Sequence, residues 1–225
     1  MDTVSLRTRR IGGALGIVAA LAMIPAYVVG SPEVPASTDE AAEYYEQAAL
    51  FVSANGWLPV VHLLGVMLFL GVLAAVLRSA APGSVALRTA AIGGGYVWMA
   101  LTAAGFAAEV AYPAATLRFE DLTEAGFLAP LMLTLASWLY HFCQVAAAVM
   151  MIGTALLTYT AAPDRPAAFP RWFAFVSIPF IVLALLHTWL PYSYWSAIAG
   201  LGWLVIASLL LFAAPKVSVV EERVA

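Results

Sequence analysis

Four polar residues recur at helical spacing inside one long apolar segment, residues 127–159. They are three, four and three positions apart, so a helix would place them on one face. The residues are Thr134, Ser137, His141 and Gln144. In hydrocarbon each unsatisfied polar group costs several kcal/mol, so this face is predicted to point into a helix bundle or a water-filled cavity.

A second polar face includes the one acidic residue expected within a membrane span. Thr102, Gly105, Glu109 and Tyr112 repeat the same three, four, three spacing. Carboxyl groups inside membranes are rare and mark functional sites. Glu109 is therefore a candidate acid or base, because burial beside other titratable groups can adapt a carboxyl to proton transfer near neutral pH.

All three histidines fall in the same half of the predicted membrane region as Glu109. The predicted catalytic set is Glu109, His141, His62 and His187. The predicted substrate-binding set is Ser137, Tyr140, Gln144, Tyr112, Trp138, Trp189 and Tyr192. A structural role is the alternative: His141 would then bond Ser137 or a backbone carbonyl, and the Trp and Tyr side chains would be interfacial anchors.

Composition identifies the class of protein that must position these residues. Of 225 residues, 64% are apolar and only 10% are charged, and the mean hydropathy is +0.93. These values predict an all-α, polytopic membrane bundle with a single domain over residues 1–225. Six transmembrane helices are expected at about residues 11–30, 49–77, 89–112, 127–159, 172–190 and 195–213.

The segments between these helices carry local signals. Residues 31–48 and 113–126 are predicted acidic outer loops, and Ser37-Thr38-Asp39-Glu40 is expected to cap a short surface helix. Gly93, Gly94 and Gly95 indicate close helix packing rather than a phosphate loop. A cleaved signal peptide is the rival interpretation of residues 11–30, although that apolar run exceeds the usual length.

Charge asymmetry predicts the orientation. Nine of the ten Lys and Arg residues lie on one side of the predicted membrane, and only Arg118 lies on the other, with nine of the thirteen acidic residues. The positive-inside rule therefore puts both termini in the cytoplasm and the acidic loops outside the cell membrane.

Three classes of function fit the predicted outer-half site. The first is an enzyme that transforms a lipophilic, isoprenoid-like or lipid-like substrate by acid–base chemistry, such as proton-initiated isomerisation or cyclisation. The second is a non-enzymatic binding or partner subunit, or a small transporter. The third is an electron-transfer subunit with a b-type haem held by His62 and His187, which are predicted at similar depths.

Other chemistry is excluded by the sequence. Cys143 is the single cysteine, so an internal disulfide or a cysteine-rich metal site is excluded. No metalloprotease or serine-hydrolase motif is present, and no basic face for nucleic acid. We expect no metal and no cofactor; the expected partners are membrane lipids, a small lipophilic ligand and, for the partner-subunit class, another membrane protein.

Two segments combine apolar residues with a single arginine: the apolar run 63–70, which continues to Arg78, and the segment Ala168-Phe-Pro170-Arg171-Trp172-Phe173. They resemble a group of uncharacterised six-helix membrane proteins that is common in actinobacteria. The resemblance implies the six-helix fold. It implies no activity and no catalytic residues.

Overall fold

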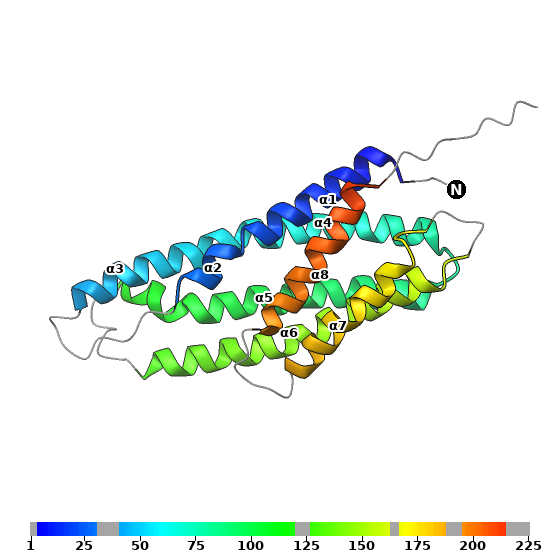
Figure 1. The fold of residues 1–225 in the computed structure, drawn as a ribbon. Coiled ribbons are helices and arrows are strands. Elements are labelled where there is room, and N and C mark those ends of the chain that lie inside the picture. Colours follow the sequence, from blue (N-terminus) through cyan, green and yellow to red (C-terminus); the bar gives the residue numbers. More distant parts are fainter. Residues whose placement is uncertain (1–3, 31–40, 120–126, 163–166, 188–194, 215–225) are drawn as a thin grey trace, which may run out of the picture.

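The computed structural model describes residues 4–30, 41–119, 127–162, 167–187 and 195–214, and these residues form helices and short turns without strands (Figure 1). The helices are α1 (Leu6–Leu21), α2 (Ile24–Val28), α3 (Ala41–Val52), η1 (Ser53–Trp57), α4 (Leu58–Ala80), α5 (Val85–Thr116), α6 (Leu128–Tyr159), α7 (Trp172–His187) and α8 (Trp195–Phe212).

Within the described residues these segments form six rods. A short turn separates α1 from α2, and α3, η1 and α4 follow one another without a break. Four of the rods are long and apolar enough to cross a membrane, namely Leu6–Val28, Glu43–Ala80, Val85–Thr116 and Leu128–Tyr159. The chain is therefore a helical membrane protein, as its composition predicted. The remaining rods, α7 and α8, are shorter and also apolar.

Several helix ends differ from the predicted ones, and two of them bear on the site. The helix predicted over 49–77 begins at Ala41, so the second half of the expected acidic loop is helical and is joined to the span. The helix predicted over 89–112 continues through Pro113 to Thr116. Proline is tolerated in membrane helices because neighbouring groups can hydrogen-bond the backbone carbonyl that loses its N–H donor.

Pro59 accounts for the wide turn between α3 and α4. A proline has no N–H and its ring clashes with the carbonyl four residues earlier, here that of Asn55. The chain responds with π-helical geometry over Ser53–Trp57, in which the N–H of Leu58 bonds the carbonyl of Ser53, five residues back. The buried Asn55 side chain donates to the carbonyl of Phe51 at 3.3 Å.

Glycines let the rods approach closely. A side chain at Gly13 would meet the backbone of α8, and one at Gly94 would lie 2.8 Å from both the Ala146 carbonyl oxygen and the Met150 nitrogen of α6. Gly95 faces Leu70 of α4, whereas Gly93 faces open space. Close packing, as predicted, explains two of the three consecutive glycines.

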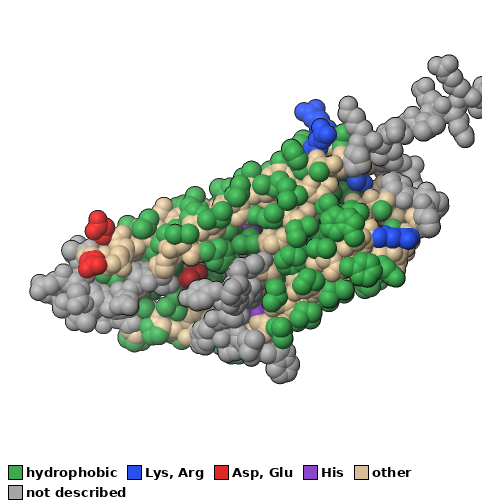
Figure 2. Space-filling model, viewed as in Figure 1, with side chains coloured by type: hydrophobic (Ala, Val, Ile, Leu, Met, Phe, Trp, Pro, Cys, Tyr) green, Lys and Arg blue, Asp and Glu red, His purple; other side chains and the backbone are tan. Residues whose placement is uncertain are grey.

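The rods differ in length, and charge gathers at the ends of the bundle. The start of α3, the end of α5 and the start of α6 extend together beyond the other helices (Figure 1). Figure 2 shows the basic side chains at the end where α1 begins and most of the acidic ones at the opposite end, with an apolar surface between them. This separation is the pattern on which the predicted orientation depends.

Candidate functional site

Among the described residues, the shortest hydrogen bond between side chains of different helices joins Glu109 to Tyr140. The Tyr140 hydroxyl on α6 donates to Oε2 of Glu109 on α5 at 2.6 Å. This length is typical of an O–H donor on an ionised carboxylate. The contact depends on Gly105, one turn before Glu109, because a Cβ there would clash with the Tyr140 ring.

Further polar groups surround this pair. Tyr27 on α2 lies within electrostatic range of Glu109 and Cys143. The Cys143 thiol donates to the Tyr140 carbonyl at 3.0 Å, and the Gln144 amide nitrogen approaches the Cys143 sulfur at 3.7 Å. Three helices thus contribute polar groups to one cluster, defined here as the Glu109 cluster: Tyr27, Glu109, Tyr140, Cys143 and Gln144.

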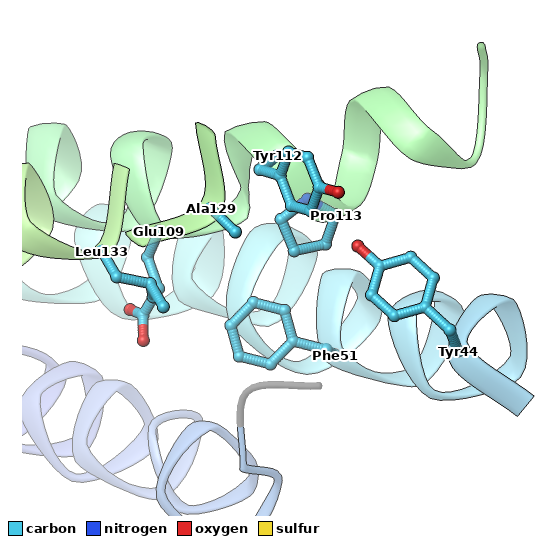
Figure 3. Close-up of a pocket in the computed structure, with 7 residues that line it drawn as sticks. All are labelled: Tyr44, Phe51, Glu109, Tyr112, Pro113, Ala129 and Leu133. Carbon is cyan, nitrogen blue, oxygen red and sulfur yellow. The ribbon is translucent and has the colours of Figure 1, made fainter. Parts of the chain in front are cut away.

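A small pocket lies on the other side of Glu109, between α3, α5 and α6. Its volume is about 20 Å³, and its lining residues are Tyr44, Phe51, Glu109, Tyr112, Pro113, Ala129 and Leu133 (Figure 3). A cavity of this size holds about one water molecule. In Figure 3 the Glu109 carboxylate lies on one side of the Phe51 ring, and the Tyr44 and Tyr112 hydroxyls lie close together on the other.

His141 and His187 form a second contact, between α6 and α7. Their ring centroids are 5.6 Å apart with an interplanar angle of 49°. The His141 ring also lies edge-on to Trp138 at 5.3 Å, and Trp138 is 55% exposed. These rings form a partly exposed aromatic group on the outer surface of the bundle.

His62 lies apart from both groups. It is buried, its Nδ1 is 2.9 Å from the Ala19 carbonyl oxygen of α1, and its ring is edge-on to Trp98 at 6.4 Å. Within the described part of the chain, neither a hydrogen bond nor a ring contact joins His62 to His187. These contacts indicate a structural role for His62, whose side chain links α4 to α1.

The structure therefore brings together some of the predicted residues and separates others. Glu109, Tyr140 and Gln144 share the Glu109 cluster, and Tyr112 lines the neighbouring pocket. His141, His187 and Trp138 form a different group. Ser137 is half-buried on α6 beside Trp138, while Trp189 and Tyr192 lie outside the described residues.

The sequence prediction missed the contributions of α2 and α3. Tyr44 and Phe51 line the pocket and are buried, as is Ala48 between them. Their spacing of four and three is the signal that marks a buried helical face. Tyr27 offers no comparable signal, because its position depends on how α2 lies against α5 and α6.

No protein-family model, curated protein or solved structure matches the chain. The candidate site therefore rests on the geometry of the residues that form it. The resemblance to six-helix actinobacterial membrane proteins stays a prediction.

Proposed function

We propose that this membrane protein binds a small lipophilic ligand in its outer half, with the Glu109–Tyr140 pair as the polar anchor of the site. The observation that carries the proposal is the 2.6 Å hydrogen bond between two helices beside an apolar pocket. Polar groups are costly in a membrane, so a carboxyl and a hydroxyl held together there mark a site of recognition or proton transfer.

The proposal includes six spans with both termini in the cytoplasm of the producing cell. Charge supports this orientation, because the end at which α1 begins is basic and the opposite end is acidic (Figure 2). Glu109 lies 21 residues after Arg88, or about 32 Å along an α-helix. Since the hydrocarbon core is about 30 Å thick, this length supports a carboxyl at the outer boundary of the core.

A catalytic form of the proposal is proton-initiated isomerisation or cyclisation of the ligand. A proton would pass from the Glu109–Tyr140 pair to a carbon–carbon double bond, and a base would remove a proton from the neighbouring carbon. Tyrosine rings nearby stabilise the intervening positive charge. His141 and His187, the predicted proton partners, contact each other rather than Glu109, so the geometry supports binding better than catalysis.

A partner subunit without catalysis is the second candidate, and the length of α6 favours it. The 32 residues of α6 contain no charged side chain and extend about 48 Å. This length exceeds the hydrocarbon core. Phe127, beside the first turn, is 73% exposed. An apolar surface beyond the bilayer is typical of contact with another membrane protein.

Lipid extraction tests the proposed ligand site. The protein is purified, its size-exclusion profile is checked, and the bound lipophilic molecules are extracted and identified by mass spectrometry. Wild-type protein is expected to retain a species that Glu109→Gln and Tyr140→Phe lose.

Matched controls are available toward both ends of the helical bundle. Glu46→Gln changes an exposed carboxylate at the acidic end, and Tyr159→Phe changes an exposed tyrosine at the other end of α6. Both controls are expected to retain the species. A ligand site at Glu109 would be refuted if the wild type, the two site variants and the two controls all retained the species equally. It would also be refuted if the controls lost the species as fully as the site variants.

A further inference from the structure

The charge of Glu109 has no cationic partner in the described part of the chain. Among the described residues, Tyr140 is the one side chain that hydrogen-bonds the Glu109 carboxylate, and no Lys, Arg or His of this part of the chain interacts with it. Arg118, the described cation nearest in sequence, instead lies over the Phe119 ring at 5.3 Å. A partly buried carboxylate normally has a counter-charge, because removing it from water is costly.

The pocket beside Glu109 has the composition of a cation site. Tyr44, Phe51 and Tyr112 provide three aromatic rings, each buried, and the Tyr44 and Tyr112 centroids are 6.5 Å apart. Rings beside a carboxylate attract ammonium groups through the negative faces of their π-systems. An ionised carboxylate also offers about four acceptor positions, of which the Tyr140 hydroxyl occupies one.

Pro113 also lines the pocket. It lies four residues after Glu109, so the Glu109 carbonyl lacks the N–H that would bond it in a regular helix. The side chains that converge at the pocket thus include a carboxylate and three aromatic rings.

Size restricts the cation. A cavity of about 20 Å³ admits a group of about the volume of water. A primary ammonium group fits this volume, whereas a trimethylammonium group does not. Leu133, 40% exposed, and the half-buried Glu109 mark the open side, through which the rest of a ligand would leave.

Depth indicates the source of the amine. Glu109 is about 32 Å from Arg88 along α5, and Tyr112 and Pro113 lie one turn farther. Because the hydrocarbon core is about 30 Å thick and the headgroup layers extend the bilayer to about 40–45 Å, these residues lie at headgroup level.

We propose that the pocket formed by Tyr44, Phe51, Glu109 and Tyr112 binds the primary ammonium group of an amine-bearing lipid. This inference rests on the proposed ligand site and names its ligand class. The ammonium donates to the Glu109 carboxylate and contacts the three rings, and the acyl chains pass out beside Leu133 to the surrounding bilayer.

Native mass spectrometry of the full chain in detergent tests the proposal. The probes are phosphatidylethanolamine, phosphatidylcholine and diacylglycerol with identical acyl chains, and ethylamine as a water-soluble amine. Phosphatidylethanolamine is expected to bind at least about tenfold more tightly than phosphatidylcholine. Glu109→Gln and Phe51→Leu are each expected to remove most of this preference, whereas Glu46→Gln preserves it.

The outcomes separate the inference from the proposed function. Glu109-dependent binding of diacylglycerol as tight as that of phosphatidylethanolamine would overturn the ammonium inference and leave the lipophilic ligand site intact. Ethylamine binding as tight as phosphatidylethanolamine would support an ammonium site and overturn its assignment to a lipid. Both proposals fail if Glu109→Gln and a folded Phe51→Leu each bind all four probes with the affinities of the wild type.

Discussion

Alanine substitutions at the three consecutive glycines of α5 are expected to have three different effects. A Cβ at Gly94 would lie 2.8 Å from two backbone atoms of α6, whereas non-bonded carbon contacts are about 3.5–4.0 Å. The helices would have to separate by roughly 0.7–1.2 Å, and overpacking of this kind costs about 1–3 kcal/mol. At Gly93 a Cβ meets nothing within 4 Å, so Gly93→Ala should be stabilised by up to about 1 kcal/mol through helix propensity.

Gly95→Ala should fall between them. Its Cβ would lie 2.6 Å from Leu70 Cδ2, the end of a side chain that can rotate away. Thermal unfolding of the three variants in one detergent gives the comparison, with about 2–4 °C expected per kcal/mol for a chain of this size. Gly93→Ala melting as far below the wild type as Gly94→Ala would refute close packing of α5 on α6 as the cause.

Three further predictions concern packing, orientation and cofactor content. Ser177→Ala removes the acceptor of the buried Trp203 indole N–H, 2.9 Å away, and should lower the free energy of unfolding by about 1–3 kcal/mol. Thr134→Ala removes an exposed hydroxyl that bonds only its own helix, and should lower it by less than about 0.5 kcal/mol. Thermal unfolding of both variants measures the difference. Equal losses would contradict the buried bond. In a Cys143→Ala background, a cysteine replacing Glu46 should react with an impermeant reagent on intact cells and one replacing Ser84 should not; the reverse pattern would invert the proposed topology. Purified protein should have no Soret band, because His62 and His187 contact different partners; a band abolished by His62→Ala would establish the haem alternative.

Helix positions could be predicted closely from the sequence, because an apolar run of sufficient length has few alternatives in a membrane. The helix predicted over residues 127–159 spans Leu128–Tyr159 in the structure. Helix ends near prolines could not be predicted as well. Pro59 and Pro113 would stop or bend a helix in water, but here the chain continues through a π-helical turn at the first and without a break at the second.

The candidate site was predictable only where one helix determines it. The face of α5 with Thr102, Gly105 and Tyr112 is buried as its spacing indicated. The matching face of α6 is not uniformly buried: Gln144 lies inside, while the Thr134 hydroxyl is exposed and bonds the carbonyl of Pro130. Contacts between helices, such as that between Glu109 and Tyr140, depend on rotation and axial offset, which spacing within one helix does not specify.

The length of the α5–α6 pair couples the candidate site to membrane thickness. Each helix has 32 residues, or about 48 Å, and a tilt of 40° still leaves roughly 37 Å across a core of about 30 Å. The ends of both helices therefore extend beyond the hydrocarbon core even when the pair is tilted. In bilayers of long acyl chains Glu109 would lie within hydrocarbon, and in bilayers of short chains it would meet water. Ligand occupancy is accordingly expected to vary with acyl-chain length, and membranes of different thickness would hold the same protein in different states.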